Sequence, residues 1–263
     1  MIDICMLTCN RARITELCIR ELARRARRAK CFLWALDNGS EDDTWQTLQG
    51  LEQEGRVDMI MRSDVNRGVH WGFNTLLDKM AALRAITDSA PGTEDVPRSP
   101  YYICTDPDII PMNTDPDWLA QLVDLADRHP EYAAIALRPH VMIGDNVARM
   151  FEHAPEVVER DHVGAVLRLM RVDAVRDVGG WKRDYVKPSR NNEEWYICGK
   201  LRKAGWKVGY ARDIYAIHLF GDPDEGEDPW GYPQGVEHGH VDRWPPVNHY
   251  SWERMGIDWE TCR

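Results

Sequence analysis

The sequence has no run of about eighteen consecutive apolar residues, the length that a membrane-spanning helix needs. Its first residues also lack the basic-then-apolar order of a signal peptide and favour a strand instead. We therefore expect no transmembrane segment, and the cytoplasm is the expected location. At 263 residues, of which 43% are hydrophobic, the chain is long enough for one α/β domain with a sizeable core.

Closely spaced cysteine pairs are also missing. The seven cysteines are scattered, include no CxxC pair and are odd in number, which favours reduced thiols over a disulfide framework or a zinc site. The sequence has no excess of positive charge either: its net charge of −10 argues against broad affinity for DNA or RNA. No GxGxxG follows a predicted strand, which argues against a Rossmann oxidoreductase.

Short apolar segments alternate with longer amphipathic ones, which is typical of a mainly parallel central sheet flanked by helices. The expected fold class is therefore α/β. Strands are predicted over residues 2–8, 32–37, 57–62, 101–105, 132–137, 164–171 and 206–211. Helices are predicted over residues 14–29, 41–54, 68–85, 118–128 and 192–204. Residues 87–100 are expected to form a loop, and residues 221–263 an irregular C-terminal tail that packs on the same domain.

Polar residues follow four of these strands at the point where each strand ends. In open α/β sheets, ligands bind beyond the carboxyl ends of the strands, so we expect the four clusters to meet on one rim. Each cluster alone is also what an ordinary turn contains. The clusters are Thr8-Cys9-Asn10-Arg11, Asp37-Asn38-Gly39-Ser40, Asn66-Arg67-Gly68 and Asp106-Pro107-Asp108.

Asp106 and Asp108 flank a proline directly after an apolar strand. Two carboxylates held close together by a stiff residue can offer oxygen ligands to a hard divalent cation, which completes its shell with water and phosphate oxygens. A solvated Asp-Pro turn is the alternative interpretation.

The order TCNR, DNGS, NRG, DPD, GGW, NNEEW and a later histidine resembles the family 2 glycosyltransferases of the GT-A fold. The resemblance spans most of the chain, and DPD matches the DxD motif of the family. It implies a GT-A domain over 1–220, with a nucleotide-sugar-binding half over 1–110 and an acceptor half over 111–220. The implied activity is inverting transfer of a sugar from a nucleotide-diphosphate sugar, with UDP as the expected nucleotide and Mn²⁺ or Mg²⁺ as the cofactor.

The resemblance also implies roles for the residues that match the family motifs. Three groups of residues would bind the nucleotide, its base, and the ribose and diphosphate, and a fourth group would hold the metal. These are Thr8, Asn10 and Arg11 for the nucleotide pocket, Asp37 for the base, Asn66, Arg67 and Gly68 for the ribose and diphosphate, and Asp106, Asp108 and His218 for the metal, with Asp106 also facing the ribose.

Transfer to an acceptor hydroxyl needs a general base, and Glu193 and Glu194 at the start of a predicted helix are the candidates. Acidic residues in a first helical turn also stabilise the helix dipole, which is the structural alternative. The family commonly has Glu-Asp here, with the second residue as the base, so Glu194 is favoured and Glu193 stays open. Gly180 and Trp181 resemble the glycine-aromatic loop near the acceptor. The indole would form a flat platform there, and core packing of Trp181 is the alternative.

Two features limit the resemblance. The polymerising members carry transmembrane helices and a Gln-x-x-Arg-Trp motif, whose nearest match here is His240-Val-Asp-Arg243-Trp244, so a processive synthase is not expected.

A sugar nucleotidyltransferase would need a glycine-rich signature after the first strand, which TCNRAR lacks. A catalytically silent nucleotide-sugar-binding module remains an alternative. The acceptor is open among a glycan, a protein and a small molecule, and the negative charge argues against a modified nucleic-acid base.

Overall fold

The computed structural model describes residues 1–26, 31–88, 99–112, 117–139, 151, 153–182 and 193–219. Its strands are β1 (Ile2–Thr8), β2 (Cys31–Asn38), β3 (Met59–Ser63), β4 (Tyr101–Thr105), β5 (Ile109–Pro111), β6 (Tyr132–Pro139), β7 (Val157–Glu159), β8 (Arg168–Arg171) and β9 (Lys207–His218). Its helices are α1 (Ala12–Arg25), α2 (Thr44–Gln53), α3 (Val69–Asp88), α4 (Trp118–Arg128), α6 (Val172–Asp177) and α7 (Glu193–Lys203).

One open sheet connects both halves of the described chain. Its strand order is β3-β2-β1-β4-β8-β6-β9-β5, and β7 pairs with β9 outside this path. Strands β3, β2, β1 and β4 are parallel to one another. From β8 onward the sheet is mixed, because β8 is antiparallel to both β4 and β6, whereas β9 is parallel to β6. The predicted α/β fold with a helix-flanked central sheet is confirmed, but the sheet is mainly parallel only in its first half. A strand that is buried on both faces gives no sequence signal for its direction.

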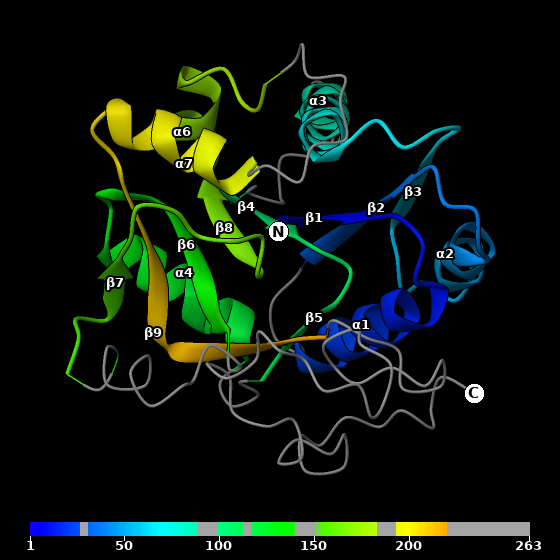
Figure 1. The fold of residues 1–263 in the computed structure, drawn as a ribbon, viewed down its shortest axis with the longest axis horizontal. Helices are drawn as coiled ribbons and strands as arrows, with labels where there is room; N and C mark the ends of the chain where they lie inside the picture. Colours follow the sequence, from blue (N-terminus) through cyan, green and yellow to red (C-terminus); the bar gives the residue numbers. More distant parts are fainter. Residues whose placement is uncertain are drawn as a thin grey trace, which may run out of the picture.

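The helices cover both faces of the sheet and make three layers (Figure 1). In β1 the side chains alternate between the two faces, as the two-residue period of a strand requires. Ile2, Ile4 and Met6 pack in the core shared with α1, α2 and α4. Cys5 and Leu7 pack in the core shared with α3, α6 and α7. Because both faces are covered, this strand is apolar along nearly its whole length, and the sequence predicts it at its observed bounds.

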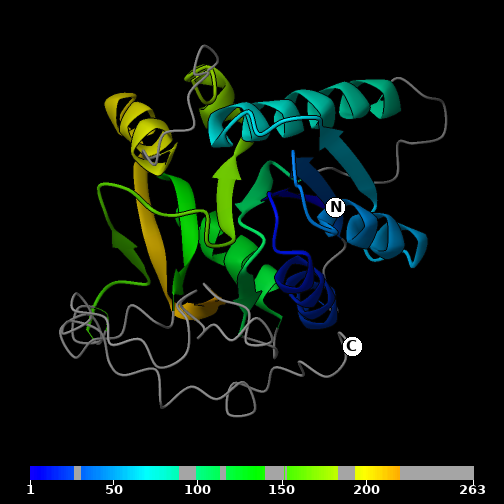
Figure 2. The ribbon, with the colours of Figure 1, turned by 45° about the vertical axis from the view of Figure 1, so that its right-hand side comes forward.

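A short strand pair closes the lower side of the sheet next to α1. β5 begins directly after Asp108 and runs antiparallel to the end of β9, with Ile109 opposite His218. Figures 1 and 2 both show the end of β9 lying beside β5 and α1. The sequence did not predict β5, because three residues are too short for a periodic pattern, and it ended β9 at residue 211. This pairing brings residue 218 back to the DPD segment.

Other expectations have mixed outcomes. Within the described ranges, no helix is long and apolar enough to cross a membrane. The six cysteines that the structure describes are all free thiols. The predicted tail over 221–263, the partial motif at 240–244 and most of the predicted loop over 87–100 lie outside the described residues.

Candidate active site

The four polar clusters lie at the carboxyl ends of four adjacent parallel strands. β3, β2, β1 and β4 are neighbours and point the same way, so the residues that follow them meet on one rim of the sheet. Each cluster makes side-chain contacts with at least one other cluster, as described below. The expectation that they converge on one rim therefore agrees with the geometry.

The turn after β1 is tied to the turn after β2. The backbone N–H of Asn10 donates to Oγ of Ser40 over 2.7 Å, and Oδ1 of Asn10 accepts from the backbone N–H of Glu41 over 2.9 Å. Asn10 and Arg11 both have left-handed backbones, with φ of 61° and 66°. Each such residue costs about 1–2 kcal/mol when it is not glycine. This strained turn directs the Arg11 side chain from the start of α1 toward the end of β4.

Asp37 is fully buried at the end of β2. Its Oδ1 accepts from the backbone N–H of Ser40 over 2.9 Å, and its Oδ2 lies 3.3 Å from Nε of Arg62. In this structure Asp37 therefore stabilises the turn, and Arg62 lies beside its second oxygen. Gly39 has φ of +78°, and a Cβ there would lie 2.3 Å from the backbone carbon of Val65. Only glycine lets the segment after β3 approach this turn.

Asn38, which the sequence did not single out, organises the Asn66-Arg67-Gly68 segment. Its Nδ2 donates to Oδ1 of Asn66 over 3.2 Å, and its Oδ1 accepts from the backbone N–H of Arg67 over 3.0 Å. Oδ1 of Asn66 also accepts from the backbone N–H of Gly68 over 2.9 Å. Gly68 has φ of +81° and leads into α3. These contacts hold the loop in its conformation without a ligand, and they occupy the side-chain oxygen of Asn66.

Asp108 lies at the centre of the candidate site. Nη1 of Arg11 is 2.8 Å from its Oδ2, and Nε2 of His218 is 3.2 Å from its Oδ1. The register of β5 with β9 explains the second contact, because it puts His218 opposite the residue that follows Asp108. The His218 contact does not have the geometry of a hydrogen bond, so within the described part of the chain no donor reaches the buried Oδ1. A buried carboxylate oxygen without a donor is costly, and a cation would satisfy it.

Three neighbouring carboxyl groups affect the pKa of Asp106. Burial raises the pKa of Asp106 well above its ordinary value, and the negative charges of Asp108, Glu193 and Glu194 raise it further. Arg168 lowers it only in part. Burial and the neighbouring carboxylates therefore both favour the protonated, neutral form of Asp106.

The structure separates the two candidate bases. Glu193 is buried, and both of its oxygens lie 3.0 Å from Nη2 of Arg168. Its Oε2 also accepts from Nε1 of Trp181 over 2.6 Å. Glu193 is thus held inside the protein, and its candidacy as the base is corrected for this reason. Glu194 is partly exposed in the first turn of α7.

The interpretation of Trp181 as an acceptor platform is also corrected. Trp181 is only 1% exposed and packs against Phe73, with ring centroids 5.2 Å apart. Gly180 has φ of +65°, and its carbonyl accepts from Nζ of Lys200 over 3.3 Å. The glycine-tryptophan pair therefore turns the chain and anchors it in the core, and neither indole face is open.

Trp195 is an exposed aromatic residue that the sequence analysis did not select. It is 50% exposed in α7, directly after Glu194, and stacks on His162 with ring centroids 4.0 Å apart and an interplanar angle of 23°. The carbonyl of Val163, next to His162, accepts from Nη1 of the buried Arg168 over 2.9 Å, which fixes this loop. Arg168 itself had a sequence signal: an arginine within an apolar strand needs a buried carboxylate partner.

The residues fit a divalent cation only in part. Asp108 and His218 offer an oxygen and a ring nitrogen close together, and oxygen and imidazole ligands suit Mn²⁺ and related ions. However, no group of three or more His, Cys, Asp or Glu side chains within the described ranges is arranged to hold a metal. Arg11 takes the second oxygen of Asp108 instead.

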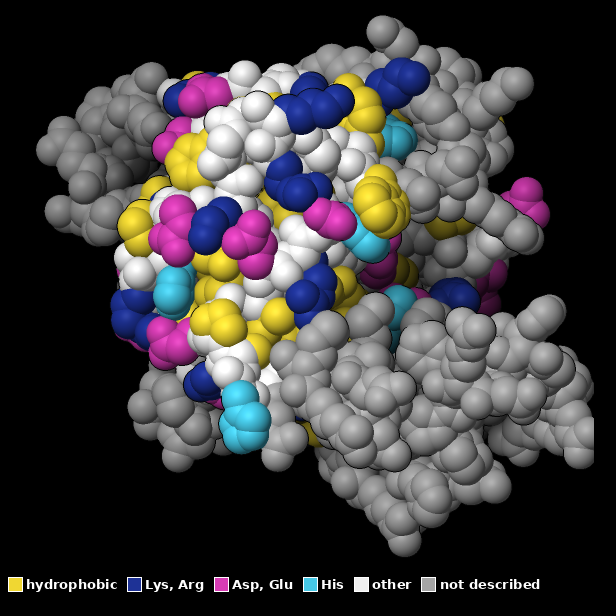
Figure 3. All heavy atoms as spheres, turned by 60° about the vertical axis from the view of Figure 1, so that its left-hand side comes forward, with side chains coloured by type: hydrophobic (Ala, Val, Ile, Leu, Met, Phe, Trp, Pro, Cys, Tyr) yellow, Lys and Arg dark blue, Asp and Glu magenta, His cyan; other side chains and the backbone are white. Residues whose placement is uncertain are grey.

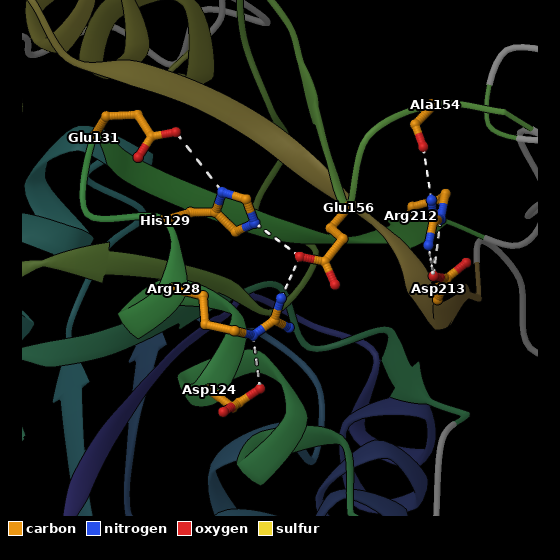
Figure 4. A network of polar contacts seen from close by, with 8 residues as sticks. All are labelled: Asp124, Arg128, His129, Glu131, Ala154, Glu156, Arg212 and Asp213. Atoms are coloured by element: carbon orange, nitrogen blue, oxygen red, sulfur yellow. Dashed lines mark hydrogen bonds and ion pairs between the residues drawn. The ribbon is translucent and has the colours of Figure 1, made fainter.

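A second polar cluster lies away from this rim, between α4, the start of β7 and the middle of β9 (Figure 4). Glu156 contacts both Arg128 and His129, and Arg212 donates to the carbonyl of Ala154 over 2.7 Å. A cavity of about 200 Å³ adjoins it, and none of the predicted site residues lines this cavity. The role of these contacts is structural, because they connect α4 and β9 to the segment before β7.

Charges on the side of the molecule drawn in Figure 3 are mixed. Described acidic and basic side chains alternate on this face and do not gather by sign. The described side chains on this face form no basic patch of the kind that nucleic acids bind.

Comparison with protein families decides the assignment. The family described as glycosyl transferase family 2 matches residues 3–175, which is more than half of the chain. The chain belongs to glycosyl transferase family 2. This membership supports glycosyl transfer as its general activity, and it agrees with the resemblance found in the sequence. None of the curated proteins compared with the chain matches it.

Solved structures, among them that of a mannosyltransferase, share the fold of this family 2 protein. The mannosyltransferase PcManGT from Pyrobaculum calidifontis, in complex with GDP-Man and Mn²⁺, superposes with a TM-score of 0.61 at 17% identity, over 82% of this chain and 56% of that chain. TarS 1-349 of S. aureus in complex with UDP gives a TM-score of 0.56 at 14% identity, over 85% of this chain and 62% of that chain. The chain thus spans less than two thirds of the length of these structures.

Proposed function

We propose that the chain is a metal-dependent, inverting glycosyltransferase of the hexosyltransferase type, which uses a nucleotide-diphosphate sugar as donor. The single observation that carries this proposal is the position of Asp108. Its carboxylate lies at the carboxyl end of β4, one of its oxygens is buried and receives no hydrogen bond from the described residues, and His218 is 3.2 Å away. A cation there would meet the diphosphate of a nucleotide bound along the rim.

UDP is our preferred nucleotide, and GDP is the main competitor. The TarS structures are in complex with UDP and with UDP-GlcNAc, whereas PcManGT is in complex with GDP-Man. In our proposal, Thr8, Asn10 and Arg11 line the nucleotide pocket and Asp37 receives the base once Arg62 moves aside. Asn66, Arg67 and Gly68 approach the ribose and diphosphate through backbone groups that Asn38 holds in place.

Asp106, Asp108 and His218 would hold Mn²⁺ or Mg²⁺. When bound, the cation supplies Lewis-acid stabilisation of the negative charge that develops on the leaving diphosphate. On the acceptor side, Glu194 takes the proton from the attacking hydroxyl. Glu193 does not compete for this role, because Arg168 and Trp181 hold its carboxylate inside the protein. Attack from the side opposite to the leaving group inverts the anomeric configuration.

We assign the acceptor platform to Trp195 in place of Trp181. Its half-exposed indole follows the proposed base directly in the chain and is stacked on His162. A flat aromatic surface suits the apolar face of a sugar ring, which favours a glycan or a small glycoside as the acceptor.

Release of nucleoside diphosphate from sugar nucleotides tests the proposal. With Mn²⁺, we expect the wild type to release UDP or GDP from at least one common sugar nucleotide, and we expect Asp108→Asn and Glu194→Gln to lose this release. NMR of the transfer product should show an inverted anomeric carbon. Tight binding of a sugar nucleotide without release or transfer would instead support the catalytically silent module.

A further inference from the structure

Arg11 connects the nucleotide and metal parts of the proposed site. Its Nη1 lies 2.8 Å from Oδ2 of Asp108, and this ion pair joins the start of α1 to the DPD segment across the rim. The Asp108 side chain is only 8% exposed, whereas that of Arg11 is 42% exposed. The guanidinium of Arg11 thus pairs with the carboxylate that is proposed to bind the metal ion. Because Arg11 is partly exposed, an arriving ligand can reach this guanidinium.

The backbone keeps Arg11 in this position. Asn10 and Arg11 are consecutive left-handed residues, and Asn10 is anchored through Ser40 and Glu41. Strained backbone of this kind persists only where the surrounding structure determines it, and it gathers at functional sites. The ion pair is therefore part of a built turn, and the long side chain beyond it is the movable part.

A second described arginine near the carboxylates is already engaged. Arg168 is fully buried and donates to Glu193 and to the carbonyl of Val163. Of the two, Arg11 alone contacts Asp108 and is also accessible to a diphosphate. Guanidinium groups bind phosphate oxygens in the same forked geometry with which they bind carboxylates.

We propose that Arg11 competes with the divalent cation for Asp108 and is released by the nucleotide. In the free protein its guanidinium neutralises Asp108 and weakens cation binding. A nucleoside diphosphate draws the guanidinium to its phosphates, which frees Oδ2 of Asp108 for the cation. Nucleotide and cation then strengthen each other's binding, as linkage requires. This inference rests on the proposed function, because it takes Asp108 as a ligand of the cation.

The test measures Mn²⁺ binding without nucleotide, through the electron paramagnetic resonance signal of the free ion. Arg11→Gln should bind Mn²⁺ at least about tenfold more tightly than the wild type, because a repelling charge is removed. Arg11→Lys keeps the charge and should stay close to the wild type. The matched control is Arg20→Gln, which removes the same charge from the same helix, where Arg20 pairs with Glu54. It should leave Mn²⁺ binding unchanged, and Arg11→Gln combined with Asp108→Asn should lose the gain.

A second readout excludes a merely structural effect. In EDTA, UDP and GDP should bind Arg11→Gln more weakly than the wild type, so the substitution shifts the two affinities in opposite directions. Equal or weaker Mn²⁺ binding by Arg11→Gln, including no binding by either protein, overturns the inference. The proposed function fails separately, if UDP and GDP bind the wild type equally well in EDTA and in Mn²⁺.

Discussion

Arg168 and Glu193 form a buried ion pair in which one guanidinium nitrogen lies 3.0 Å from each carboxylate oxygen. The pair joins β8 to the first turn of α7, and Trp181 donates to the same carboxylate. It fixes the helix end that carries Glu194. Two neighbouring glutamates thus differ in role because only one of them meets a partner from a distant strand.

This ion pair predicts non-additive stability changes. Arg168→Met and Glu193→Leu should each lower the free energy of unfolding by about 3–5 kcal/mol, because each leaves an uncompensated buried charge. The double variant should recover most of the loss. Urea unfolding of the four proteins measures the cycle, and additive losses in the double variant would contradict a coupled pair.

Glu194→Gln should reduce sugar transfer by about 100- to 10,000-fold, the usual contribution of a general base. The side chain is partly exposed, so the melting temperature and the affinity for UDP or GDP should stay near those of the wild type. Glu131→Gln, at an exposed position between α4 and β6, serves as the matched control. A Glu194→Gln protein with wild-type turnover would remove Glu194 from the mechanism.

Truncation of Trp181 should mainly lower stability, whereas truncation of Trp195 should mainly weaken acceptor use. Trp181→Ala should cost about 3–5 kcal/mol of stability, because it empties a fully buried indole site. Trp195→Ala should cost at most about 1.5 kcal/mol, the value of one aromatic stacking contact. It should keep donor hydrolysis and weaken acceptor use. Denaturant unfolding and hydrolysis assays separate the two, and equal stability losses would argue against an exposed platform.

Gly39→Ala should destabilise the protein by about 2–3 kcal/mol and weaken nucleotide binding, because a Cβ there meets the backbone of Val65. Gly55→Ala is the control. Gly55 also has positive φ, but no atom lies within 4 Å of the added Cβ, so only backbone strain of about 1–2 kcal/mol remains. Unfolding curves and UDP or GDP titrations of both variants test the difference. Similar nucleotide affinities in the two variants would contradict the role of this turn.

The sequence predicted the rim better than the contacts within it. Strand ends are marked by polar residues after apolar runs, so the positions of Asp37 and Asp108 follow from the pattern. His218 came from family resemblance, because the three-residue strand that brings it to Asp108 leaves no periodic signal. The burial of Trp181 could not be predicted, since an indole suits both a core and a platform. The resemblance favoured Glu194, but the sequence could not exclude Glu193, because its partner Arg168 comes from another part of the chain.

The central claim is that Asp108 holds the cation that binds the nucleotide diphosphate. The most direct measurement is the affinity for UDP and GDP, by calorimetry in Mn²⁺ and in EDTA, for the wild type and Asp108→Asn. The account predicts that Mn²⁺ strengthens binding of one nucleotide to the wild type, and that Asp108→Asn loses about 10- to 100-fold of that affinity in Mn²⁺. Equal affinities of the two proteins in Mn²⁺ would contradict it.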